Sequence, residues 1–133
     1  MLRDLTARRV VVAGTDADLA AVLVRLLRRE RLDVEVAYVP RGRSAAARVW
    51  GLPRDPGALA LDGGATPVPL VRDDVGGVLV GRARARLRGE AYCDETLVLR
   101  GAGQGVVAPG PDGVAGRASR TGRPPDGRVR PVP

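Results

Sequence analysis

The 133-residue sequence contains no Phe, Ile, Lys, Asn or His, and it has one cysteine, one tryptophan and two tyrosines. Phe, Ile, Lys and Asn share A/T-rich codons, so we attribute their absence to a GC-rich genome and expect Arg in place of Lys to carry little functional information. The core must be built from Val, Leu and Ala, which bury less area per residue than aromatic side chains. We therefore expect modest stability, to which self-association as a homo-oligomer would add.

The missing residue types exclude several kinds of site. Without His no Ser–His–Asp triad forms, and Cys93 alone supports neither an intrachain disulfide nor a multi-cysteine metal site. No apolar run approaches the ~20 residues of a membrane-spanning helix. The start, MLRDLTARRVVVAG, has too short an apolar run and an acid too early for a signal peptide. The sequence predicts a cytoplasmic protein with no transmembrane segment and no metal site.

The net charge is +7, from 22 arginines against 15 acids. A basic balance favours nucleic acid, anionic lipid or phosphorylated ligands. The arginines are spread along the whole chain, without the dense block of a dedicated nucleic-acid arm. We attribute most of the charge to solvation and codon bias.

The first half of the sequence predicts a strand, a helix and a second strand. RVVVAG (9–14) is a continuous apolar run typical of a buried parallel strand, and DVEVAYV (33–39) alternates as a strand does. Between them an apolar stripe at helical spacing comprises Leu19, Val22, Leu23, Leu26 and Leu27. Asp16 or Asp18 is a natural N-cap of this helix. The pattern predicts a right-handed βαβ unit.

The rest of the chain predicts an α/β class with a β-rich second part. After Pro40 we expect a short helix capped by Ser44, a helical turn near 56–61 and irregular chain up to about 76. Residues 76–87 and 90–101 predict a hairpin that turns at Arg88–Gly89, and GQGVVAPG offers one more short strand. The expected parts are an α/β unit (1–66), a β-rich segment (67–108) and a mobile Pro/Gly/Arg-rich tail (109–133).

Residues 9–53 resemble the catalytic domain of diacylglycerol kinases and bacterial lipid kinases, in the same group as NAD kinases. That family has a strand, a GGDGT turn, a helix, a second strand, a P-x-G-T-x-N turn, a short helix and a G-[LI]-P stop. VVVAGTDADLAAVLVRLL and VAYVPRGRSAAARVWGLPRD follow this order and spacing, apart from one residue missing in the second turn. The sequence does not identify a cofactor; the resemblance implies ATP and Mg²⁺ only if the nucleotide site is retained. The nucleotide-site positions it implies are Gly14, Thr15, Asp16, Asp18, Gly42 and Arg43.

The sequence departs from the family's pattern where phosphate would bind. Thr15 and Ala17 replace glycines, and each adds a Cβ where the backbone of the turn would have to approach a phosphate closely. Asp18 replaces a hydroxyl residue. A carboxylate ~4 Å from a phosphate oxygen costs about 4 kcal/mol at an effective dielectric of ~20, unless Mg²⁺ bridges the charges or Arg43 offsets them. We find no sequence that matches the family's first strand and helix, or most of its second domain with the catalytic base. The resemblance therefore implies a degenerate, truncated kinase-like protein without phosphotransfer and with at most weak nucleotide or phosphate binding.

Two other interpretations stay open. Asp16 and Asp18 are also explained as helix caps that need no ligand. Four arginines lie two residues apart, ~6.6–7 Å between neighbours on a strand, and would line one face: Arg82, Arg84, Arg86 and Arg88. They fit an anionic lipid surface or a charged face that shields a sheet edge, and the lack of interleaved aromatics argues against nucleic acid. The alternative function is a non-enzymatic interaction or regulatory module that binds a protein partner or an anionic surface.

Overall fold

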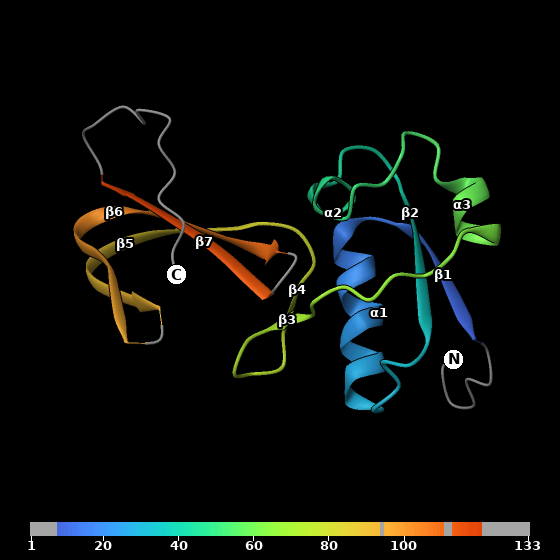
Figure 1. The fold of residues 1–133 in the computed structure, drawn as a ribbon, viewed down its shortest axis with the longest axis horizontal. Helices are drawn as coiled ribbons and strands as arrows, with labels where there is room; N and C mark the ends of the chain where they lie inside the picture. Colours follow the sequence, from blue (N-terminus) through green and yellow to red (C-terminus); the bar gives the residue numbers. More distant parts are fainter. Residues whose placement is uncertain (1–7, 94, 111–112, 121–133) are drawn as a thin grey trace.

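The computed structural model describes residues 8–93, 95–110 and 113–120. Within them the chain is a mixed α/β protein with strands in three small sheets (Figure 1). The helices are α1 (Asp16–Arg28), α2 (Ala45–Val49) and α3 (Gly57–Asp62). The strands are β1 (Arg9–Gly14), β2 (Glu35–Pro40), β3 (Val71–Arg72), β4 (Val78–Leu79), β5 (Ala83–Cys93), β6 (Thr96–Gly110) and β7 (Gly113–Arg120). The predicted mixed α/β class is confirmed.

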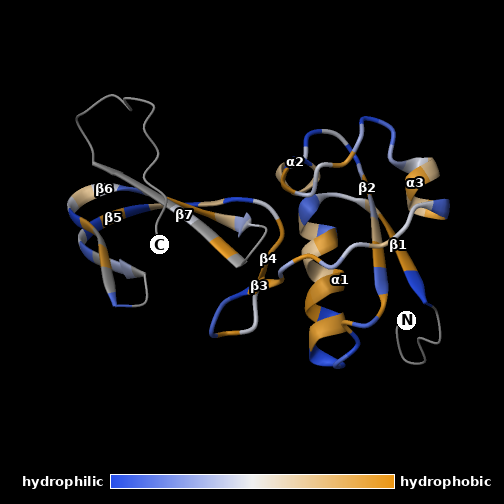
Figure 2. Cartoon of the chain, viewed as in Figure 1, coloured by the Kyte–Doolittle hydropathy of each residue, from blue (hydrophilic) through white to orange (hydrophobic). Residues whose placement is uncertain are grey.

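The N-terminal unit consists of two parallel strands joined by a helix. β1 and β2 pair from Arg9 opposite Glu35 to Gly14 opposite Pro40. α1 packs against this pair because its apolar stripe is buried at Leu19, Leu23 and Leu26. Figure 2 shows the apolar residues running along α1 and the two strands. Hydrophobic periodicity was sufficient to predict this arrangement.

The core lies between α1, the β1–β2 pair and the start of α2. Tyr38 is 2% exposed, and its ring meets the edge of Trp50 with centroids 6.4 Å apart. The buried cluster comprises Val12, Leu19, Leu23, Tyr38, Ala46 and Val80, with Leu70 and Val78 packed against it. Residues after 66 thus complete the core of the first unit, so the boundary expected at 66 does not separate two independently packed parts.

The two short helices lie close to where the sequence predicts them. Ser44 is the N-cap of α2, and its hydroxyl accepts a hydrogen bond from the Ala47 N–H at 2.8 Å. α3 begins after Pro56 and has no side-chain cap. At its other end, Arg9 from β1 donates to the carbonyls of Ala60 and Leu61 and to that of Gly63, the residue after the helix. None of the helices in the described part of the chain has the length and apolarity that a membrane crossing requires.

The predicted hairpin turn at Arg88–Gly89 is wrong. β5 continues through both residues and pairs with β6 as far as Cys93 opposite Thr96. Gly89 has a φ of 115° and lies opposite Gly101, whose φ is 101°. These backbone conformations suit glycine, and here they bend a paired ribbon instead of reversing the chain. Figure 1 shows β5 and β6 curving together in this region.

The strand expected over 76–87 is interrupted. Val78–Leu79 forms β4, which pairs with β3, and the chain then passes Gly81 before β5 begins. A Cβ at Gly81 would lie 3.0 Å from the Ala45 Cβ and 3.2 Å from the Ala46 backbone nitrogen. The break therefore lies where the chain passes closely against α2.

Part of the expected mobile tail is a strand. β7 pairs antiparallel with β6 from Gly110 opposite Gly113 to Gly103 opposite Arg120. Its residues are small apart from one valine and two arginines, so core burial did not predict it, but backbone pairing along β6 holds it. Of the tail expected at 109–133, residues 111–112 and 121–133 lie outside the described residues.

Candidate functional site

The two turns that the sequence singles out lie side by side. The Arg41 N–H donates to the Gly14 carbonyl at 2.8 Å, and the Ser44 hydroxyl donates to Asp16 Oδ1 at 2.5 Å. Both turns follow the carboxyl ends of neighbouring parallel strands. Open α/β sheets bind their ligands at this kind of edge. We call residues 14–18 and 40–44 together the two-turn junction.

The sequence led us to expect Asp16 as a candidate N-cap of its own helix, but in the structure it does not cap that helix. Its Oδ1 accepts hydrogen bonds from the hydroxyls of Tyr38 at 2.8 Å and Ser44 at 2.5 Å. Its Oδ2 accepts from the Ala46 N–H at 3.1 Å. One carboxylate thereby ties the start of α1 to the end of β2 and the first turn of α2.

These contacts also set the protonation state of Asp16. Burial alone would raise its pKa, but hydrogen bonds from Ser44, the Ala46 N–H and Tyr38 outweigh burial and hold the pKa below its ordinary value. The pKa of Tyr38 is raised, chiefly by burial and then by its hydrogen bond to Asp16. Asp16 is therefore a carboxylate at neutral pH whose oxygens are both engaged by the protein itself.

Thr15 and Asp18 form a reciprocal cap at the start of α1. The Thr15 hydroxyl accepts from the Asp18 N–H at 3.3 Å, and Asp18 Oδ2 accepts from the Thr15 N–H and hydroxyl, each at 2.8 Å. The Thr15 N–H, followed by its hydroxyl, lowers the pKa of Asp18. Thr15, not an aspartate, is the N-cap. Asp18 thus occupies donors that a phosphate at this helix start would need.

Gly14 is required by this cap. A Cβ at Gly14 would lie 2.5 Å from Asp18 Oδ2, so only glycine leaves room for the carboxylate.

The second turn is more open. Gly42 has a φ of 82°, and Arg43 is exposed with no hydrogen bond or ion pair to another described residue. Arg41 is close enough to help lower the pKa of Asp18.

The structure therefore brings Gly14, Thr15, Asp16 and Asp18 into one junction with the Gly42–Arg43 turn. Sequence reasoning placed Tyr38 only within the strand 33–39 and Ser44 only at a helix cap, and so missed their part in the network. The sequence carried one signal for it. Ser44 follows the second turn at the position where a helix must begin, so its hydroxyl was bound to lie near that edge of the sheet.

The arginines predicted to line one face belong to another sheet. Arg84, Arg86 and Arg88 alternate along β5, and Arg82 directly precedes it. Their partners across β6 are Val106, Gln104 and Ala102, none of which is charged. All four arginines are exposed, and within the described residues none forms an ion pair. We call Arg82, Arg84, Arg86 and Arg88 the arginine ladder.

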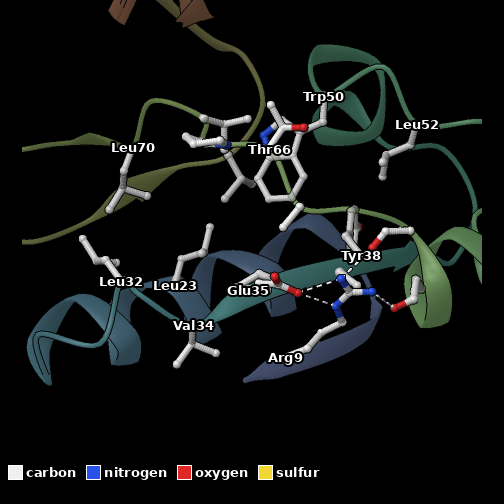
Figure 3. Close-up of a pocket in the computed structure, with 18 of the residues that line it drawn as sticks. Arg9, Leu23, Leu32, Val34, Glu35, Tyr38, Trp50, Leu52, Thr66 and Leu70 are labelled. Atoms are coloured by element: carbon white, nitrogen blue, oxygen red, sulfur yellow. Dashed lines mark hydrogen bonds and ion pairs between the residues drawn. The ribbon is translucent and has the colours of Figure 1, made fainter. Parts of the chain in front are cut away.

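A cavity of about 570 Å³, which the sequence did not predict, lies beside β2 (Figure 3). Its walls are mostly apolar, and Trp50, Leu23 and Leu70 contribute to them. At its base Arg9 donates to Glu35 at 2.6 and 2.8 Å and to the carbonyls of three residues, Ala60, Leu61 and Gly63. These bonds use all five N–H groups of the guanidinium, so Arg9 has no donor left for a ligand.

No three Cys, Asp or Glu side chains in the described ranges gather closely enough to hold a metal ion. Comparison of the chain with models of known protein families, with curated proteins and with solved structures finds no match.

Proposed function

We propose that the chain is a non-enzymatic cytoplasmic binding module, built on a scaffold similar to the nucleotide-binding half of lipid kinases, that contacts an anionic partner through the arginine ladder. The observation that carries this proposal is the row of exposed arginines opposite uncharged residues on β6. A charged face that served only solubility would mix both signs. A row of one sign supplies a field that attracts anions.

The chemistry of the two-turn junction supports a role other than phosphotransfer. A kinase site needs carboxylates free for magnesium and backbone donors free for phosphate. Both oxygens of Asp16 and the capping oxygen of Asp18 are hydrogen-bonded within the chain. These aspartates therefore stabilise the fold.

The proposal is tested with inorganic polyphosphate as the anionic probe. The ladder variant carries Arg84→Gln, Arg86→Gln and Arg88→Gln. The matched control carries Arg25→Gln, Arg28→Gln and Arg29→Gln, three exposed arginines at the end of α1. Both lose the same charge, so a surface-specific interaction predicts about a hundredfold weaker binding for the ladder variant and less than about fivefold for the control. Equal losses in the two variants would reject the proposal.

Weak phosphate binding at the two-turn junction is a second candidate, favoured by the contact between the two turns and by Arg43, which has no partner in the described part of the chain. Because Asp18 occupies the Thr15 donors, we expect millimolar Mg-ATP to leave the melting temperature almost unchanged. The combined change Thr15→Gly, Ala17→Gly and Asp18→Thr restores the family's turn. It should lower stability and gain calorimetrically detectable ATP binding. Lower stability without binding would leave only a capped helix.

A further inference from the structure

We infer that the cavity beside β2 binds an extended, uncharged peptide of a partner protein, which adds to the outer edge of β2 as a third strand. This inference goes beyond the proposed function, because the residues that line the cavity include none of the arginine ladder. Three observations carry it: backbone groups without partners at the edge of β2, apolar walls on both faces of the sheet, and charges that are already paired.

The outer edge of β2 carries backbone groups that no other strand pairs. The Glu35 N–H donates to the Arg8 carbonyl at 2.9 Å, so Glu35 directs its backbone groups toward β1. Alternate residues of a strand direct these groups to opposite edges, so those of Val36 and Tyr38 face away from β1. Within the described residues β2 pairs with β1 alone, and neither residue has a backbone hydrogen bond at the outer edge. Tyr38 is only 2% exposed, and buried backbone groups are almost always hydrogen-bonded in folded proteins. This edge therefore favours a partner that supplies its own backbone.

The cavity lies along this same edge. It borders residues 33–38, and Figure 3 shows β1 on one side of β2 and Trp50, Thr66 and Leu70 on the other. Its volume of about 570 Å³ is within the range of ligand pockets, ~300–1,000 Å³. At ~3.3 Å per residue, an extended segment of about six residues matches the length of chain that borders it.

The walls of the cavity are apolar on both faces of the sheet. Val36 packs against the core cluster on the face of α1, where Leu23 lines the cavity. The neighbouring Glu35 points to the opposite face, where its partner Arg9 reaches the carbonyls of α3 and Leu59 lines the cavity. A third strand would direct alternate side chains to these two faces, and strands buried on both faces are continuous apolar runs. The occupant is therefore apolar at successive positions.

The charged residues that line the cavity are Arg9, Asp33 and Glu35, and all three are already paired. Arg9 pairs with Glu35 at 2.6 Å, and Asp33 pairs with Arg31 at 2.9 Å. A charge added between them would lose its hydration without gaining a counterion of its own, which is costly. The occupant is therefore uncharged.

The apolar runs of the described chain already lie in paired strands, β1, β2 and β4 among them. A second copy would have to unfold one of these strands to supply the segment. Because Trp50 and Leu70 lie beyond the edge of β2, the cavity admits a single extended segment and not the edge of a second folded sheet. We therefore assign the occupant to a different protein. Strand addition to a sheet edge is a common mode of peptide recognition, in which main-chain hydrogen bonds supply affinity.

The experiment uses as its probe the peptide QVVVVQ, acetylated and amidated so that it carries no charge. Trp50 is the only tryptophan in the sequence and lines the cavity, so its fluorescence reports binding to the full chain. The comparison peptide QVQVQQ is apolar on one face only, and we expect it to bind at least about tenfold more weakly. The ladder variant should bind QVVVVQ like the unaltered chain.

Two proline variants test the backbone pairing. Val36→Pro removes an outward N–H donor without removing a hydrogen bond between β1 and β2, so it should weaken peptide binding about tenfold. Val11→Pro is the matched control, because Arg8 faces β2 and Val11, three residues further along, faces the outer edge of β1. It should bind within about twofold of the unaltered chain.

Hydrogen exchange of the unaltered chain gives the same test if Val36→Pro does not fold. Bound QVVVVQ should slow exchange of the Val36 amide about tenfold or more and leave the Val11 amide unchanged. If the peptide shifts Trp50 fluorescence but does not protect the Val36 amide, the cavity binds apolar groups without strand pairing and the inference is wrong.

The remaining outcomes also decide the matter. The inference fails if neither peptide binds at millimolar concentration, or if the two peptides bind equally well. If the chain alone forms a dimer that Val36→Pro abolishes, the occupant is a second copy and the assignment to a partner protein is wrong. Polyphosphate binding by the ladder is measured separately, so failure of the proposed function leaves this test intact.

Discussion

Asp16 illustrates how a residue with the expected chemistry for a ligand can serve the fold. It lies in the turn where the sequence led us to expect a nucleotide site, yet its partners are Tyr38, Ser44 and the Ala46 N–H. Hydrogen bonds to a charged group stabilise more than bonds between neutral groups. The residue joins three segments that the chain brings together from up to 30 positions apart.

Replacing Asp16 by Ala should therefore lower the free energy of unfolding by about 2 kcal/mol, because it leaves the Ser44 hydroxyl and the Ala46 N–H without their acceptor. The Tyr38 hydroxyl keeps only the Gly14 carbonyl, at 3.2 Å, as its acceptor. Urea unfolding followed by circular dichroism measures this. Asp74→Ala is the control, since Asp74 is exposed and no hydrogen bond involves its side chain within the described residues. It should change stability by less than about 0.5 kcal/mol. If Asp16→Ala and Asp74→Ala change the free energy of unfolding equally, Asp16 does not stabilise the fold and is again a candidate ligand-binding residue.

The same carboxylates predict how stability depends on pH. The pKa values of Asp16 and Asp18 lie below the ordinary 3.8 in the folded chain. Between the folded and the unfolded pKa, the unfolded chain binds more protons, so acid favours unfolding. Their contribution is fully present above pH 3.8 and is lost as the pH falls through the folded pKa values. Urea midpoints should fall with pH in that acid range, and less steeply in Asp16→Asn; an identical slope would contradict this.

At the level of elements, the glycine pair in the β5–β6 ribbon decides the shape of the hairpin. Gly89→Ala and Gly101→Ala should each destabilise by about 1–3 kcal/mol, because both glycines have φ values above 100°. Gly64→Ala is the matched control, since an added Cβ there meets no atom within 4 Å and its φ is not positive. It should be neutral or slightly stabilising. Unfolding by urea reports all three, and a neutral result at both ribbon positions would show that the bend is not needed.

The elements also show where the sequence suffices and where it does not. The β1–α1–β2 unit was predictable because the apolar period of each segment is local. Gly89 was misread as a turn because its role depends on Gly101, which lies opposite only after the strands pair. The adjacency of the two turns followed from parallel pairing. The link from Asp16 to Ala46 did not, because it depends on how closely α2 approaches α1.

For the molecule as a whole, composition predicted the thin aliphatic core but not how far along the chain it extends. The cluster around Tyr38 includes Val80, beyond the irregular segment that seemed to end the first unit. The cavity beside β2 likewise depends on where residues 63–70 cross the sheet. Such placements result from long-range packing, to which local propensity contributes little.

The last prediction concerns the C-terminal sheet. The sequence led us to expect a mobile tail from residue 109 onward, but β7 pairs with β6 beyond that point. A chain ending at Gly110 leaves β5 and β6 as a two-stranded hairpin, which is marginally stable in water. Its β5 and β6 amides should lose protection from hydrogen exchange while the α1 amides keep theirs, because the core cluster ends at Val80. A chain ending at Arg120 retains β7 and serves as the control. If the amides of β5 and β6 are equally protected in both chains, β7 does not stabilise the sheet.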